Sequence, residues 1–165
     1  MGDSMRHIIS ALVENRFGVL ARVAGMFSGR GFNIDTLNVG PTLDPKHSRM
    51  TIVVRGNDKV LDQVTKQLEK LANVIHVENF LDEDYVDREL VLLRVNATSK
   101  TRGEIIQLCG VFEAKVIDVQ RKTVAIEVTG SSQKIEKFLG LMTGFGISDL
   151  TRTGLVALPR SQVLL

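Results

Sequence analysis

The sequence repeats one order of structural patterns, strand, helix, strand, strand, helix, strand, in its first and second halves. In the first half, short β-rich or alternating runs predict strands at residues 7–13, 33–39, 49–55 and 73–80. Apolar stripes at helical spacing predict two intervening helices, with Val19, Leu20, Val23, Met26 and Phe27 in one and Val64, Leu68 and Leu71 in the other. The first half therefore reads βαββαβ.

The second half predicts the same order again. Its expected strands are residues 89–96, 116–119, 123–128 and 147–153. Its helical stripes comprise Ile105, Leu108, Cys109 and Phe112, then Ile135, Phe138, Leu139 and Met142. Thr101 and Glu104 have the spacing of a capping box at the start of the first of these helices. We therefore predict an α+β protein of two tandem ferredoxin-like sandwiches, with antiparallel sheets and the helices on one face of each.

Composition sets the expected domain boundaries. We predict a first domain at 5–80, an acidic linker at 81–88, a second domain at 89–158 and a tail at 159–165. The linker is rich in acidic side chains with little to bury, which is typical of a solvated connection. The strand at 49–55 has no wholly polar face, so we expect oligomerisation through exposed sheet.

Several partner classes are disfavoured by composition. The longest apolar runs, such as residues 90–93, are far short of the roughly 20 residues that cross a bilayer, so no membrane partner is expected. The 21 basic and 19 acidic residues nearly cancel and aromatic residues make up only 5%, which disfavours nucleic acid. The single cysteine, Cys109, lies on an apolar stripe and indicates a buried thiol in a reducing, cytoplasmic compartment.

Catalytic chemistry finds no support in the sequence. His7, His47 and His76 are scattered and have no cysteine or carboxylate at metal-ligand spacing, so we assign no metal site. No nucleotide-binding glycine motif and no nucleophile with a neighbouring base is present. We therefore expect no catalytic residue and no cofactor in this chain.

One constellation suits a small ligand. Asn15 and Gly18 lie in the first strand-to-helix turn, where no Ser, Thr or Asp immediately precedes the helix to occupy its free amides. These amides and the helix dipole suit a carboxylate, and Gly18 allows close backbone approach. Asn15 and Asn33 offer oxygens that accept from an ammonium group, so an α-amino acid would fit. A purely structural interpretation is also open, in which Gly18 serves the turn, Asn15 caps and Asn33 starts a strand.

The stretch MRHIISALVENRFGVLARVAGMFSGRGFNIDTLNVGPTLDPKHSRMTIVV resembles the ACT domain that opens the small, regulatory subunit of acetohydroxyacid synthase (acetolactate synthase). ENxxGVLxR, RGFNIDTLNVGPT and SRMTI carry the resemblance, which continues through RTGLVAL near the C-terminus. It implies a chain without an active site that activates a separate, large catalytic subunit using thiamine diphosphate, Mg and FAD. It also implies feedback inhibition by valine in branched-chain amino-acid biosynthesis.

The resemblance further implies a homodimer of ACT domains with L-valine at the pairing interface. Asn15, Gly18, Val19 and Leu20 would come from one protomer, and Asn33 and Ile34 from the other. The residues alone do not separate valine from leucine or isoleucine. The second domain would be a scaffold for the catalytic subunit, and residues 1–4 an expression remnant. The alternative is an amino-acid-sensing ACT module that regulates a different enzyme.

Overall fold

The computed structural model describes residues 5–80 and 85–160, and the chain divides into two compact units. The first unit holds the described residues up to Val86 together with those from Leu155 onward, and the second is Asp87–Gly154. Each unit is considered by itself below.

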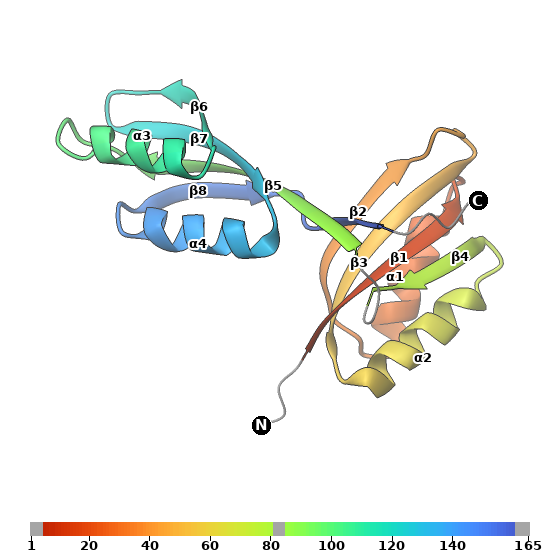
Figure 1. Cartoon of the computed structure of the whole chain (residues 1–165). Helices are drawn as coiled ribbons and strands as arrows, with labels where there is room; N and C mark the ends of the chain where they lie inside the picture. Colours follow the sequence, from red (N-terminus) through yellow and green to blue (C-terminus); the bar gives the residue numbers. More distant parts are fainter. Residues whose placement is uncertain (1–4, 81–84, 161–165) are drawn as a thin grey trace. The chain divides into compact units, whose positions relative to one another are not determined.

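The first unit is a four-stranded antiparallel sheet with the order β2-β3-β1-β4. In chain order its elements are β1 (Met5–Glu14), α1 (Val19–Gly29), β2 (Ile34–Pro41), β3 (His47–Gly56), α2 (Asp58–Glu69) and β4 (Val74–Asn79). The central pair β1 and β3 runs in register from Met5 opposite Gly56 to Glu14 opposite His47. Both helices pack on one face of this sheet (Figure 1).

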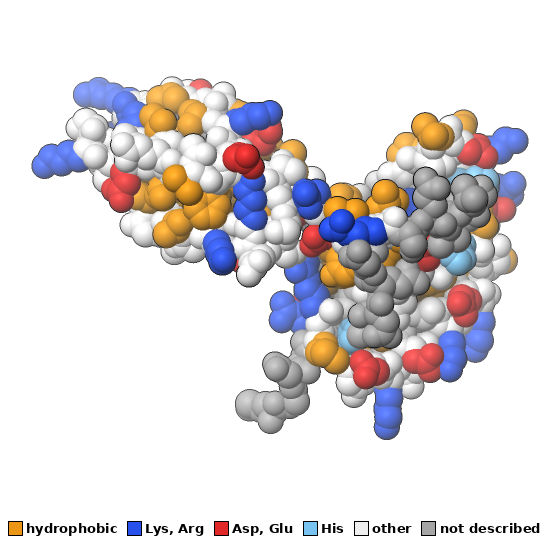
Figure 2. Space-filling view, in the orientation of Figure 1, with side chains coloured by type: hydrophobic (Ala, Val, Ile, Leu, Met, Phe, Trp, Pro, Cys, Tyr) orange, Lys and Arg blue, Asp and Glu red, His pale blue; other side chains and the backbone are white. Residues whose placement is uncertain are grey.

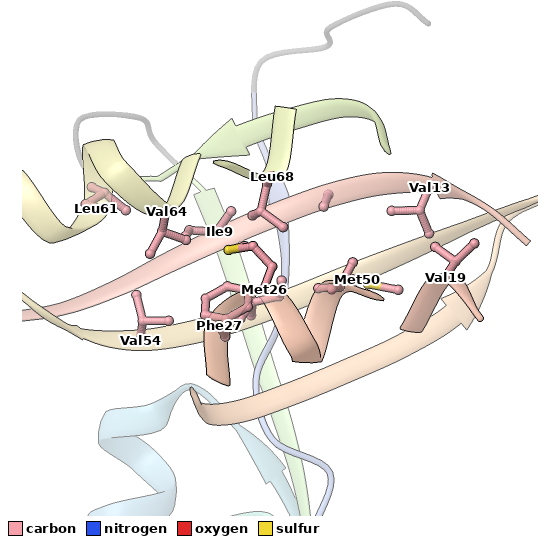
Figure 3. Close-up of a cluster of buried hydrophobic side chains, with 13 residues drawn as sticks. Ile9, Val13, Val19, Met26, Phe27, Met50, Val54, Leu61, Val64 and Leu68 are labelled. Carbon is pink, nitrogen blue, oxygen red and sulfur yellow. The ribbon is translucent and has the colours of Figure 1, made fainter. Parts of the chain in front are cut away.

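The main core of the first unit lies between that sheet face and the two helices. Figure 3 shows Met26 and Phe27 of α1 beside the side chains of α2 over the central strands. The fully or nearly fully buried members are Ile9, Ala11, Val13, Val19, Val23, Met26, Phe27, Met50, Ile52, Val54, Leu61, Val64 and Leu68. The Asn57 side chain caps α2 by accepting from the amide of Val60, which fixes where that helix begins.

The second unit repeats the arrangement with the sheet order β6-β7-β5-β8. Its elements are β5 (Tyr85–Asn96), α3 (Arg102–Val111), β6 (Lys115–Val119), β7 (Thr123–Gly130), α4 (Ser132–Thr143) and β8 (Ile147–Arg152). The predicted helical stripes supply the buried residues Ile105, Cys109, Ile135, Phe138 and Met142. The predicted α+β class, with two tandem ferredoxin-like modules, is confirmed.

A short C-terminal strand differs from the sequence-based boundaries. Strand β9 (Val156–Pro159) pairs with β5, and Leu155 and Ala157 are buried with Ile8, Val53 and Phe80 of the first unit. The predicted boundaries put residues 155–158 in the second domain and Pro159 in a tail. Within the strand predicted at 49–55, Val53 is buried by residues of the chain's own C-terminal segment, while oligomerisation through exposed sheet stays a prediction.

Smaller differences arise where strands are irregular. Strand β5 begins at Tyr85, so residues 85–88 of the predicted linker are strand, and residues 81–84 lie outside the described residues. The predicted remnant at 1–4 and the tail residues 161–165 also lie outside them. Ile75 lies in the strand predicted at 73–80 but is half exposed, because a β-bulge between the partners of Leu12 and Val13 skips it.

The predicted capping box at Thr101 is absent from the start of α3. Thr98 and Thr101 instead bond reciprocally, each hydroxyl accepting from the other residue's amide at 3.2 and 3.0 Å.

The surface carries both signs of charge. Basic and acidic side chains are interspersed over the face of the first unit seen in Figure 2. Among the described residues, no helix combines the length and the apolarity needed to cross a membrane.

Candidate functional site

The turn between β1 and α1 has the geometry that the sequence predicted for a ligand-binding helix start. Gly18 has a φ of 81°, a left-handed conformation that glycine adopts without a steric cost. It precedes the first residue of α1, no side chain caps the helix, and no acidic residue lies in its first turn. Neither a capping side chain nor an acidic residue of the first turn therefore competes with an external anion for the amides of this helix start.

The first amides of α1 remain available. Arg22 donates to the Gly18 carbonyl at 2.9 Å and so makes the first helical bond. Within the described part of the chain, the amides of Leu20 and Ala21 have no such carbonyl acceptor. Together with the partial positive charge of the helix end, these two donors form a site suited to a carboxylate.

Asn15 is held rigidly by the loop between β2 and β3. Its backbone amide donates to the Lys46 carbonyl at 2.7 Å, and its side-chain Nδ2 donates to the Pro45 carbonyl at 2.9 Å. The side-chain donor is thereby engaged within the protein. The acceptor Oδ1 remains available to an ammonium group, as the sequence analysis proposed.

An open hollow lies over this turn. It is lined by Asn15, Arg16, Phe17, Gly18 and Leu20. The Leu20 side chain is half exposed there and could contact an aliphatic ligand. Val19 is different, because its side chain is only 4% exposed and packs in the core, so it can offer a ligand its backbone alone.

A polar network behind the turn was not predicted from the sequence. Asn73 donates to the Glu14 carboxylate at 2.6 Å and accepts from Arg22 of α1 at 2.6 Å. Glu14 also donates its amide to the Asn73 carbonyl at 2.9 Å. The network ties the end of β1 to the first turn of α1. Because Asn73 is distant in sequence, only the folded chain reveals it.

The other predicted residues lie at the opposite end of the same sheet. Ile34, the first residue of β2, pairs with Val54 of β3, whereas Glu14, next to Asn15, pairs with His47. The two β3 positions are seven residues apart, which corresponds to about 24 Å along a strand. One chain therefore does not bring Asn33 and Ile34 to the hollow over Gly18.

Asn33 is itself oriented by its neighbours. Its Nδ2 donates to Asp35 at 3.2 Å, and Arg55 donates from Nε to the other oxygen of the same carboxylate at 2.5 Å. This bond and the charge of Asp35 raise the pKa of the Arg55 guanidinium above its ordinary value. As at Asn15, the amide donor is engaged and the oxygen is left for a ligand.

Within the described ranges 5–80 and 85–160, we find neither a metal site nor a reactive thiol. No group of three or more His, Cys, Asp or Glu side chains there could hold a metal ion. Cys109 is buried, and this burial raises the pKa of its thiol, so it is a poor nucleophile.

Two family models match the chain. Residues 88–161 match the model described as the small subunit of acetolactate synthase, and residues 9–76 match the AHAS small subunit-like ACT domain. A probable acetolactate synthase small subunit of Archaeoglobus fulgidus is 53% identical over 158 residues, which cover 96% of this chain and 99% of that protein. The acetolactate synthase small subunit of Mycolicibacterium smegmatis is 46% identical over 154 residues, 93% of this chain and 91% of that one.

A solved structure agrees over most of the chain. The crystal structure of the acetolactate synthase small subunit from Thermotoga maritima matches with a TM-score of 0.86 and 40% sequence identity. The match covers 96% of this chain and 99% of that one.

Proposed function

The chain belongs to the family of acetolactate synthase small subunits, which are regulatory subunits of that enzyme, and on this basis we propose that it senses L-valine and conveys feedback inhibition to the catalytic subunit. The family resemblance predicted from the sequence is thus confirmed. Valine as the effector, its binding residues and the details of the catalytic partner are the proposal. The observation that carries it is the uncapped helix start at Gly18 beside a fixed asparagine.

The chemistry of the turn supports an α-amino acid. A carboxylate would accept from the free amides of Leu20 and Ala21, and an ammonium group would donate to the outward oxygen of Asn15. The half-exposed side chain of Leu20 offers an apolar contact for a branched aliphatic group. No step of this binding needs a metal or a cofactor in the chain.

We further propose that a second copy completes the site. Strand β2 is an edge of the first sheet, so its outer hydrogen-bonding groups are available to another strand. A two-fold axis through Leu37 would pair β2 with the partner's β2 in antiparallel fashion and set the Asn33 end of β2 beside the Pro41 end of the partner's strand. Pro41 pairs with Ser48 at the end of the sheet where Asn15 lies. The partner's Asn33 and Ile34 would then reach the hollow.

The proposed catalytic partner is the large subunit, which would carry thiamine diphosphate, Mg and FAD. The second unit would act as a scaffold for that subunit, since the proposed effector residues all belong to the first unit. A cytoplasmic location is also part of the proposal, in keeping with the single, unpaired Cys109.

The function is tested by purifying the chain with the catalytic subunit of the same cell. Acetolactate formation from pyruvate should rise when the chain is added, and valine should lower it only in the chain's presence. The chain by itself should give no turnover. Activation without any response to valine, leucine or isoleucine would refute the effector. No effect on acetolactate synthase would favour the alternative, an amino-acid-sensing module of a different enzyme.

The shared site is tested by mixing two inactive variants. Asn15→Ala and Asn33→Ala should each remove high-affinity valine binding when pure. After unfolding and refolding together, about a quarter of the sites should bind again, because each mixed dimer holds one site with both asparagines intact. A site contained in one chain would recover nothing on mixing. Light scattering on each sample checks that the variants still form dimers.

A further inference from the structure

Asp35 occupies an irregular position at the start of the edge strand β2. Ile34 pairs with Val54 and Thr36 pairs with Val53, so Asp35 is an extra residue with no partner on β3. An extra residue of this kind is a β-bulge, which bends the strand and redirects nearby side chains. Here the carboxylate of Asp35 reaches both Asn33 and Arg55.

The pair of Asp35 and Arg55 does little for stability. The Arg55 side chain is 63% exposed and that of Asp35 20% exposed. Ion pairs in such surroundings typically contribute little to stability, because water screens them and two side chains lose freedom. The pair nevertheless fixes the direction of the carboxylate, and Asp35 in turn fixes the amide of Asn33.

The direction of that amide decides what Asn33 can bind. An asparagine side chain presents a donor NH2 on one side and an acceptor oxygen on the other, and rotation exchanges them. An ammonium group needs the oxygen and would be repelled by the NH2 group. A carboxylate at position 35 can only accept, so it attracts the NH2 group and leaves the oxygen outward.

We propose that Asp35 is a positioning and specificity residue of the effector site, holding the Asn33 amide so that its oxygen selects an α-ammonium group, with Arg55 holding Asp35. This inference rests on the proposed function, since it concerns the same effector. It adds a reason for discrimination between an amino acid and the 2-oxo acid that has the same side chain but no ammonium group. The 2-oxo acid gains nothing from the oxygen of Asn33.

The experiment compares calorimetric titrations of full-length variants with L-valine and with its 2-oxo acid. Asp35→Ala frees the Asn33 side chain, so ordering it on binding should weaken valine binding about 3- to 10-fold. Binding of the 2-oxo acid should be unchanged. Asp35→Glu keeps the carboxylate, so it should retain most of the valine affinity that Asp35→Ala loses. Asp62→Ala is the matched control, because it removes an exposed acid that pairs with Lys66 of α2 in the same unit.

A double-mutant cycle separates positioning from a general structural effect. In an Asn33→Ala background the effect of Asp35→Ala should vanish, because Asp35 acts through Asn33. The weak valine binding that remains in the Asn33→Ala variants is measured by competition at high valine concentration. Equal losses in both backgrounds, equal losses for valine and the 2-oxo acid, or no loss at all would each overturn the proposal.

A ligand-free measurement distinguishes this inference from the effector proposal. The side-chain NH2 resonances of Asn33 should show restricted motion in the parent chain and in Asp35→Glu, and increased motion in Asp35→Ala. Unchanged motion would overturn the role of Asp35 even if valine binds. Failure of the parent to bind any branched-chain amino acid, with the expected change in motion, would overturn the effector and with it the specificity assigned to Asp35.

Discussion

Arg152 donates two parallel hydrogen bonds to the buried carboxylate of Glu89, from Nε at 2.6 Å and from Nη2 at 2.7 Å. Glu89 is 1% exposed, while Arg152 also reaches the exposed Glu136 at 3.0 Å. The bonds to Glu89 and Glu136 raise the pKa of the guanidinium, so the arginine stays charged throughout the accessible pH range. The pair joins β5 to the last residue of β8 in the second unit.

Replacing this arginine should therefore destabilise the second unit strongly. Arg152→Ala leaves the Glu89 carboxylate buried without a partner, which typically costs about 3–5 kcal/mol of unfolding free energy. Urea denaturation followed by circular dichroism measures the loss. Glu136→Ala is the control and should cost less than about 1 kcal/mol, because that carboxylate is exposed. A similar, small loss in both variants would contradict the importance of the buried contact.

Truncating Leu155 should destabilise the first unit although the residue follows the second in sequence. Leu155→Ala removes a fully buried side chain beside Ile8 and Val53, which should cost about 2–5 kcal/mol. Hydrogen exchange should show faster opening of β1 and β3 than of β7. Val156→Ala, at the exposed first residue of β9 next to Leu155, should change stability by less than about 0.5 kcal/mol. Loss of protection confined to the second unit would contradict the assignment of β9.

A carboxylate at position 18 should block the effector. In Gly18→Asp, like charges about 4 Å apart cost about 4 kcal/mol at an effective dielectric of 20, or roughly a thousandfold in affinity. Space is open there, since no atom lies within 4 Å of an added Cβ, but the φ of 81° strains any side chain. Gly18→Asn shares the strain without the charge and tolerates this conformation best. Calorimetry should show valine binding by Gly18→Asn and none by Gly18→Asp. Equal valine affinities of the two variants would mean that the ligand carboxylate lies elsewhere.

Cys109 should be unreactive and should give the fold a pH dependence at alkaline pH. Burial raises the pKa of its thiol, so the folded state keeps the proton that the unfolded state loses. The corresponding stability is complete below the ordinary thiol pKa and declines as pH rises through the folded value. Iodoacetamide should label the native chain slowly and the urea-unfolded chain quickly. In Cys109→Ala this alkaline component of the stability curve should disappear; an unchanged curve would assign it to other groups.

Local patterns were sufficient to predict most of the fold. Val19, Val23, Met26 and Phe27 of α1 face the core as predicted, because a helix places residues three and four apart on one side. Leu20 was predicted in the same stripe but is half exposed at the hollow over Gly18. The turn at Gly18 was also predictable, since the absence of a capping side chain is visible in the sequence. The exposure of Ile75 could not be predicted, because the bulge that skips it depends on how two distant strands align, which alternation along one strand does not encode.

The unpredicted parts depend on contacts between distant residues. Strand β9 is four residues long and gains its place by pairing with β5 and packing on Val53, neither of which is marked in its own sequence. Asn33 was identified as a candidate ligand residue, yet its partners Asp35 and Arg55 were not. Their meeting requires the bulge in β2, and the composition of that segment gives no sign of it.

The burial of Leu155 also governs when the protein can finish folding during its synthesis. Ile8 and Val53 emerge from the ribosome long before Leu155, and elongation at roughly 5–20 residues per second leaves this cluster uncovered for seconds. The nascent first unit can form its helix-covered core in that interval, but not the cluster on the opposite face. Completion of the first unit therefore waits until Leu155 has been synthesised, and chains that stop before Leu155 would leave the apolar surface of Ile8 and Val53 uncovered.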